Sequence, residues 1–268
     1  TRYLKIKHLQ GKSNHLLLLK MLALEDFHDD IIGKAMRGIG IGKNQIAHQL
    51  GVQKLEIEAI LNGKVDEKLI YAMAGELKLD GGKLILLAKK GWCPAPLEIE
   101  GLRQISSAYG DMIVNAYVVW DKFSRNAWII DTGTDAQPIL KFIDQEKLKV
   151  DAIFLTHTHR DHIAGLDDLR EKIEIPKVYV HKLELFEGCE PIEEGFKCSM
   201  DSLSLLAKHT HGHSTGGITF LVDGLQKTVG VVGDAIFAGS MGGGMVSYAD
   251  ALGTNREKIM SLPDETVL

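Results

Sequence analysis

The stretch Thr156-His157-Thr158-His159-Arg160-Asp161-His162 places three imidazoles and one carboxylate within six consecutive positions. It directly follows the apolar run from Ala152 to Leu155, which predicts a buried strand. In an extended segment His157 and His159 project to the same side, whereas Asp161 and His162 at the following turn can face a second point nearby. One loop can therefore serve two metal ions.

The chemistry of these side chains favours particular metals. Neutral imidazole nitrogen and carboxylate oxygen suit Zn²⁺ best and Fe or Mn acceptably. The cluster contains no cysteine, which argues against a closed structural zinc site. We therefore expect an open catalytic centre with Zn²⁺ as cofactor, two ions per chain if every ligand is present.

The segments around this loop predict strands that alternate with helices. Apolar, β-branched runs separated by a polar turn predict a hairpin, and three later runs predict further strands; these are Met112 to Trp120, Ala127 to Ile130, Val178 to Val180, Ile218 to Val222 and Thr228 to Val232. Helices are expected from Pro138 to Leu148 and from Asp167 to Lys172. This alternation is typical of a layered α/β domain.

The motif HTHRDH at residues 157–162 resembles the HxHxDH signature of the metallo-β-lactamase superfamily, and the resemblance covers residues 97–268. Three further segments are similar to the family in the same order: residues 128–133, which end in Asp-x-Gly, the Gly-His-Ser loop within residues 209–216, and Val232-Gly233-Asp234. The resemblance implies a four-layer αβ/βα sandwich. It also implies that His213 completes the first metal site, that Asp234 bridges both metals, and that Asp131 supports the metal loop. We expect His209 and His211 to support the ligands as well, although His211 stands where the family usually has proline.

One element of the family pattern has no counterpart. The family supplies a last histidine in a Gly-His-Gly loop after a further strand, but this sequence has no histidine beyond His213. The end of the sequence, Leu262 to Leu268, is similar to the strand just before that loop. We therefore expect the chain to continue past Leu268, and the alternative is a second metal site that lacks one ligand.

The resemblance implies a hydrolytic mechanism. Two cations that share Asp234 would hold a bridging water, lower its pKa towards neutrality and present hydroxide to a carbonyl carbon. Asp161 is the expected catalytic residue, because it would orient this hydroxide while ligating the second metal. The predicted activity is hydrolysis of a small ester or thioester substrate by metal-bound hydroxide.

The segment from Gly233 to Gly244 is most similar to the glyoxalase-II-like branch, which cleaves thioesters. The cations that this branch uses for the glutathione carboxylates have no counterpart after Ser240, which counts against glutathione specificity. Three alternatives stay open: a lactonase, a mononuclear iron persulfide dioxygenase, and a DNA-binding regulator whose hydrolase-like domain senses a ligand.

The pattern before the hydrolase-like part is helical from about Leu16 to Lys90, and the prolines at 94 and 96 indicate a boundary between a domain at residues 1–92 and one at residues 97–268. Residues 45–64 resemble the helix-turn-helix of phage-repressor-like proteins. The helix that would enter the major groove carries Glu56 and Glu58 with only Lys54 as a cation, so it disfavours nucleic-acid binding. We expect a packing or self-association module, which fluorescence anisotropy against DNA duplexes can test.

Composition sets the remaining expectations. Hydrophobic residues make up 45% and charged residues 25% of the 268 residues, as in an ordinary globular protein. The three cysteines form no CxxC pair, which favours a reducing cytoplasm. The apolar run from Leu16 to Leu24 is interrupted by Lys20, so no membrane span is expected. The expected partner is a small-molecule substrate, and a homo-oligomer stays open.

Overall fold

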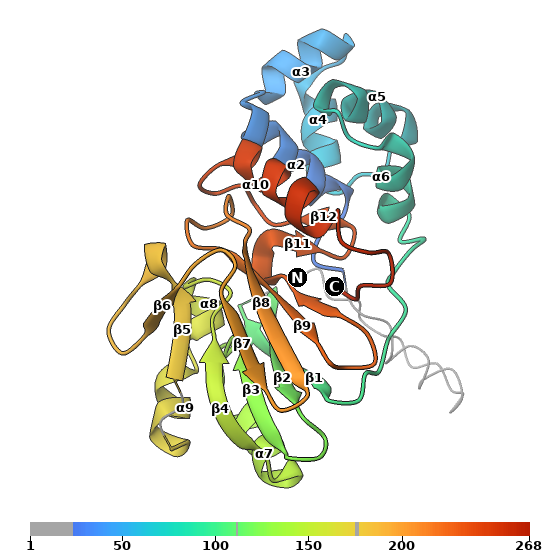
Figure 1. Ribbon diagram of the computed structural model, residues 1–268. Helices are drawn as coiled ribbons and strands as arrows, with labels where there is room; N and C mark the ends of the chain where they lie inside the picture. The colour runs from blue at the N-terminus through green and yellow to red at the C-terminus, as the bar shows by residue number, and fades with distance from the viewer. Residues whose placement is uncertain (1–23, 111, 175–176) are drawn as a thin grey trace, which may run out of the picture. The chain divides into compact units, whose positions relative to one another are not determined.

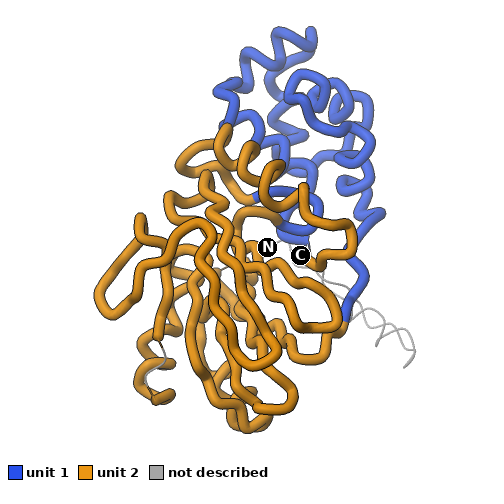
Figure 2. The backbone as a smooth tube through the Cα atoms, viewed as in Figure 1, with its two compact units in different colours: residues 1–97, 237–241 blue, residues 98–236, 242–268 orange. Residues whose placement is uncertain are grey.

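The computed structural model describes residues 24–110, 112–174 and 177–268 and divides into two compact units (Figure 2). Unit 1 comprises residues 1–97 together with 237–241, and unit 2 comprises residues 98–236 and 242–268. The sequence predicts an uninterrupted domain from residue 97 onwards. The structure differs at residues 237–241, because this short segment packs with the N-terminal helices rather than with the sheets.

The described part of unit 1 before residue 97 is helical. Its helices are α2 (His28–Ile39), α3 (Lys43–Leu50), α4 (Lys54–Leu61), α5 (Glu67–Leu77) and α6 (Gly81–Ala88). Gly40 and Gly51 end α2 and α3 at positive φ, a conformation that glycine adopts without steric cost. The predicted N-terminal helices are thereby confirmed from α2 onwards, whereas residues 16–23 lie outside the described residues.

The segment 237–241 is held in unit 1 by a polar contact with α2. The buried Asp26 carboxylate accepts hydrogen bonds from Lys34 Nζ at 2.6 Å and from the Ser240 hydroxyl. Lys34 also donates to the Met241 carbonyl at 3.2 Å. The contacts of Ser240 and Met241 thus join residues more than 200 positions apart in the chain.

Unit 2 is built on two larger sheets (Figure 1). The first has the order β1-β2-β3-β4-β5-β6, with antiparallel pairing from β1 to β3 and parallel pairing from β3 to β6. Its strands are β1 (Leu102–Tyr109), β2 (Met112–Trp120), β3 (Asn126–Ile130), β4 (Lys149–Phe154), β5 (Lys177–His181) and β6 (Glu190–Ile192). The predicted hairpin is the β2–β3 pair, and the predicted strand before the histidine loop is β4.

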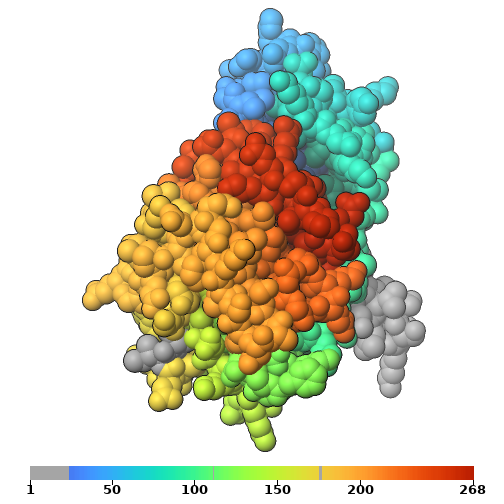
Figure 3. All heavy atoms as spheres, viewed as in Figure 1, coloured from blue at the N-terminus to red at the C-terminus, as the bar shows by residue number. Residues whose placement is uncertain are grey.

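The second sheet is antiparallel with the order β10-β9-β8-β7. Its strands are β7 (Lys197–Met200), β8 (Leu203–His209), β9 (Ile218–Asp223) and β10 (Val229–Val231). Its orange atoms form part of the near face of unit 2 in the space-filling view (Figure 3). A separate two-stranded ladder joins β11 (Ile236–Phe237) to β12 (Ser240–Met241).

Two apolar clusters hold unit 2 together. The first fills the space between the two sheets and includes the fully buried Trp128, Phe154 and Phe220. The second lies between the six-stranded sheet and its helices, where Ile139 of α7 (Gln137–Glu146) and Leu169 of α9 (Leu166–Lys172) pack against strand residues. Helices packed on a sheet that packs on a second sheet agree with the predicted α/β class, which is confirmed.

The remaining elements of unit 2 are short. They are α8 (Arg160–Ile163), η1 (Lys182–Glu184), η2 (Gly233–Ala235), α10 (Tyr248–Thr254) and η3 (Asn255–Ile259). Among the described residues of both units, no helix is long and apolar enough to span a bilayer.

Candidate metal centre

The predicted ligands come together from three loops at strand ends. The loop after β4 carries His157 and His159, the loop after β8 carries His213, and η2 after β10 carries Asp234. One nitrogen or oxygen atom from each of these four side chains lies within 4.8 Å of every other. We call these four residues the ligand cluster.

Hydrogen bonds aim two of the imidazoles into the cluster. His213 Nδ1 lies 2.9 Å from the Gly243 carbonyl, which only accepts, so this nitrogen carries the proton and Nε2 presents its lone pair. His157 Nδ1 lies 3.1 Å from the hydroxyl of Thr156, whose proton goes to Asp131. Nδ1 of His157 therefore donates as well, and its Nε2 lone pair also faces inwards.

The inward lone pairs converge on a third imidazole. His157 Nε2 and His213 Nε2 lie 3.1 and 2.9 Å from the same atom, His159 Nδ1, which carries one proton at most. Three nitrogens that share at most one proton are poorly satisfied by each other, but all three suit a cation at their centre. The geometry of the ligand cluster therefore fits a divalent metal with nitrogen and oxygen ligands.

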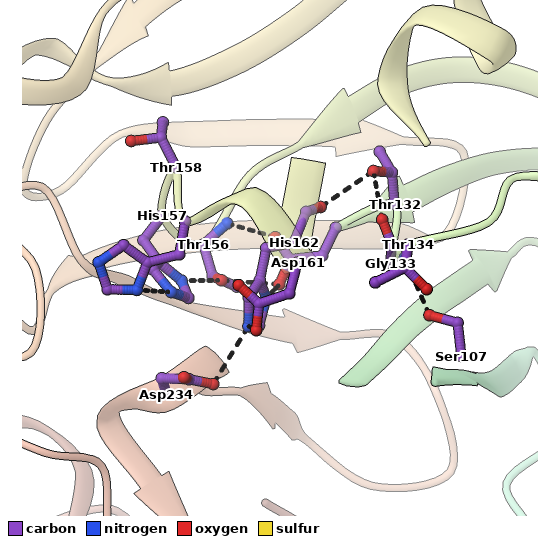
Figure 4. A network of polar contacts seen from close by, with 12 residues as sticks. Ser107, Thr132, Gly133, Thr134, Thr156, His157, Thr158, Asp161, His162 and Asp234 are labelled. Carbon is purple, nitrogen blue, oxygen red and sulfur yellow. Dashed lines mark hydrogen bonds and ion pairs between the residues drawn. The ribbon is translucent and has the colours of Figure 1, made fainter. Parts of the chain in front are cut away.

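A buried carboxylate, that of Asp131, contacts the start of the histidine loop at Thr156 and also His162, two residues that Figure 4 shows. Asp131 follows β3 at φ +58° and accepts hydrogen bonds from Thr156 N and Oγ1, both at 2.7 Å. Its Oδ2 also lies 2.8 Å from Nδ1 of His162. Asp131 thus fixes the start of the histidine loop and orients His162, as expected for a carboxylate that supports metal ligands.

Asp161 and His162 lie beside the ligand cluster, at the point expected for a second metal. His162 Nε2 is 3.2 Å from Oδ1 of Asp234 and 3.9 Å from Oδ2 of Asp161 (Figure 4). The other carboxylate oxygen of Asp234 faces His213 Nε2 at 3.4 Å. Asp234 therefore stands between the two groups of residues.

Burial and neighbouring charges shift the pKa values of these groups. Burial and the neighbouring His162 lower the pKa of His157 to about 2, so this imidazole is neutral and able to ligate. Burial disfavours the ionised form of Asp234, but the hydrogen bond and charge of His162 outweigh it and lower the pKa. Burial likewise opposes protonation of His162, yet Asp131 and Asp234 raise its pKa to about 10. The carboxylates of Asp131 and Asp234 therefore favour a positive charge at His162, which either a proton on the ring or a cation bound by the ring can supply.

Two predicted supporting histidines lie apart from the ligand cluster. His209 stacks on His181 with ring centroids 4.0 Å apart, and its Nε2 is 2.9 Å from the Thr215 carbonyl. His211 lies 4.6 Å from His209, between centroids, and is not among the converging ligand atoms. His209 thus ends β8 and His211 lies in the loop that carries His213, and neither lies at the point where the ligand atoms meet.

Sequence reasoning missed the carboxylate of Glu184. It lies in η1 after β5 and contacts the backbone of two metal-site loops. Its position after a predicted strand could have indicated it. β5 is the parallel neighbour of β4, so the carboxyl ends of both strands lie at the same edge of the sheet.

The comparisons agree with this arrangement. A profile of the metallo-beta-lactamase superfamily matches residues 109–268, which is more than half of the chain. The chain belongs to the metallo-beta-lactamase superfamily. The matched residues include the whole ligand cluster together with Asp131, Asp161 and His162.

The chain is similar to several named members of the superfamily. "Hydroxyacylglutathione hydrolase 2" of Vibrio vulnificus is 29% identical over 171 residues, 63% of each chain. "Probable metallo-hydrolase YqgX" of Bacillus subtilis is 30% identical over 188 residues, 59% of this chain and 84% of the relative. The solved BLEG-1 B3 metallo-beta-lactamase is 26% identical with a TM-score of 0.53, over 60% of this chain and 87% of that one. The chain thus spans less than two thirds of the Vibrio hydrolase.

Proposed function

We propose that this chain is a metal-dependent hydrolase that cleaves a small thioester or ester. The observation that carries the proposal is the convergence of three imidazole nitrogens and one carboxylate in the ligand cluster. The name of the Vibrio relative gives it a thioester substrate, hydroxyacylglutathione, and the Bacillus relative is also named as a metallo-hydrolase. These names support hydrolysis and favour a thioester.

The bound metal, His162 and Asp161 have different roles in the proposed reaction. When bound at the ligand cluster, Zn²⁺ would supply a Lewis acid that polarises a carbonyl and makes a water molecule more acidic. His162 keeps one ring nitrogen on Asp131 and turns the other towards Asp234, so its orientation is fixed. We assign Asp161 as the group that orients the attacking water, because its carboxylate lies next to His162 and is partly exposed.

We propose that glutathione itself is not required. The segment after Ser240 reads Met241-Gly242-Gly243-Gly244 and offers no cation for the glutathione carboxylates. Gly242 lies so close to Asp234 that a Cβ there would come within 1.7 Å of the Asp234 carbonyl. A longer side chain is thus excluded at residue 242, and a substrate with fewer charges fits this segment better.

The test compares His159→Ala and Asp234→Ala with the wild-type chain. Both variants remove a ligand from a site on a preformed scaffold, so we expect thioester hydrolysis at the background rate, reduced zinc content and an unchanged circular dichroism spectrum. The substrates are an acyl thioester of N-acetylcysteamine, lactoylglutathione and a homoserine lactone, with thiol release or ring opening as readout. His48→Ala is the control, because His48 is exposed on α3 in unit 1.

Each result has a clear meaning. Wild-type turnover and zinc content in either ligand variant would contradict the assignment of the site. Hydrolysis of the lactone alone would replace the thioester by a lactone substrate. Oxygen consumption with glutathione persulfide and iron, without thioester cleavage, would indicate the persulfide dioxygenase alternative.

A further inference from the structure

Glu184 bridges the two loops that carry the imidazoles of the ligand cluster. Its Oε2 accepts hydrogen bonds from the backbone N and the hydroxyl of Thr158, at 2.8 and 2.9 Å. Its Oε1 accepts from the backbone N of Gly216 at 2.8 Å and from the Thr215 hydroxyl at 3.3 Å. One carboxylate therefore takes four hydrogen bonds, two from each loop.

The donors of these hydrogen bonds lie close in sequence to the histidines of the ligand cluster. Thr158 stands between His157 and His159, and Gly216 lies three residues after His213. The two loops come from different sheets, since one follows β4 and the other follows β8. The distance between the loops is thus not set by any single sheet.

We propose that Glu184 is a positioning residue that sets the spacing between the two histidine loops and so tunes the metal affinity of the ligand cluster. Glu184 itself is not among the converging ligand atoms, so it acts through Thr158 and Gly216. This inference rests on the proposed function, because it assigns Glu184 a role in the same metal site.

The chemistry requires a carboxylate at this place. Two backbone N–H groups point at Glu184 from opposite loops, and an ionised carboxylate only accepts hydrogen bonds. A glutamine would turn its NH₂ group towards one of these N–H donors and lose that contact. Burial disfavours ionisation, but the hydrogen bonds from Gly216 and Thr158 outweigh it and lower the pKa of Glu184.

The close approach also depends on a glycine. A Cβ on Gly216 would lie 3.0 Å from Glu184 Cγ and 3.0 Å from the Cβ of His181. These contacts are tighter than ordinary van der Waals separations, so a side chain at residue 216 would push the carboxylate away from the loop. Gly216→Ala therefore changes the same contact from the opposite side.

The test measures metal binding directly. We compare wild type, Glu184→Gln, Glu184→Asp and Gly216→Ala by zinc competition against a chromogenic chelator and by the visible spectrum of the cobalt-loaded chain. Outer contacts to metal ligands are worth about 10–100-fold in affinity. We expect a loss of that size in Glu184→Gln and Gly216→Ala, a smaller loss in Glu184→Asp, which keeps the charge, and altered cobalt bands in all three.

The matched control is Glu193→Gln, because Glu193 is an exposed glutamate of unit 2 that pairs with Lys182. It should leave zinc affinity and the cobalt spectrum unchanged. Wild-type zinc affinity and cobalt bands in Glu184→Gln would overturn the inference. If Glu184→Gln does not fold, Gly216→Ala decides alone by the same two readouts.

Metal affinity and turnover separate the two proposals. Lowered zinc affinity in Glu184→Gln without thioester hydrolysis in any form would keep the role of Glu184 and reject the proposed substrate class. Normal hydrolysis in wild type with unchanged affinity in Glu184→Gln would reject only the role of Glu184. A wild-type chain that binds neither zinc nor cobalt would overturn both.

Discussion

Asp121 shows how one buried carboxylate organises a turn of unit 2. It follows β2 and accepts hydrogen bonds from the backbone N of Phe123 and Ser124, at 2.8 and 2.9 Å, and from the Ser202 hydroxyl. The hydrogen bonds from Ser202 and Ser124 hold its pKa well below the ordinary value of 3.8. The ionised form therefore stabilises the folded state.

The sign of the pH dependence follows from this direction. A folded-state pKa below the unfolded value gives stability that is present above about pH 4 and lost as the pH falls towards the lowered pKa. We expect Asp121→Asn to lower the free energy of unfolding by about 1–2 kcal/mol at pH 7. Urea unfolding at pH 7 and pH 3.5 should show that this difference shrinks in acid. The exposed Asp264 gives the control, Asp264→Asn, and an equal loss at both pH values would contradict the account.

At the scale of secondary-structure elements, the junction between β10 and η2 requires a glycine at residue 233. Gly233 has φ +52°, and a Cβ there would come within 2.5 Å of the Thr156 hydroxyl. That hydroxyl holds Asp131 and lies against His157. We expect Gly233→Ala to cost about 1–2 kcal/mol for the positive φ alone and to weaken zinc binding by displacing the histidine loop.

Calorimetry and zinc competition on the same samples check this expectation. Gly253→Ala is the matched control, because Gly253 lies in α10 without a positive φ and its added Cβ would meet no atom within 4 Å. That control should be neutral or more stable by about 0.5–1 kcal/mol. Wild-type stability in Gly233→Ala would show that the junction tolerates a side chain.

Strands that are buried along most of their length were predictable from their apolar sequence. A strand that is held mainly by pairing with a neighbouring strand was not. The strands β4 and β9 are buried along most of their length, so their apolar runs identify them. β1 is mostly exposed, with Arg103, Gln104, Ser106 and Ser107 along it, and pairs with β2 over its whole length. Its strand conformation comes from that pairing, which no local periodicity reports.

At the scale of the whole molecule, the residues that meet in the metal site were predictable because each lies in a short, recognisable sequence motif. The bridge from Glu184 to Thr158 and Gly216 spans three loops and has no local signature. The grouping of residues 237–241 with the N-terminal helices likewise depends on contacts distant in the chain. The role of the helical domain stays a prediction, and in the structure Glu58 pairs with Lys43 and Lys54.

We propose that the ligand cluster of His157, His159, His213 and Asp234 holds a catalytic metal. Anomalous diffraction at the zinc absorption edge, from crystals grown with zinc, tests it most directly. We expect a strong peak about 2.0–2.2 Å from one nitrogen of each of the three histidines and from a carboxylate oxygen of Asp234. A fully occupied zinc bound by other residues, with no peak at the cluster, would contradict it.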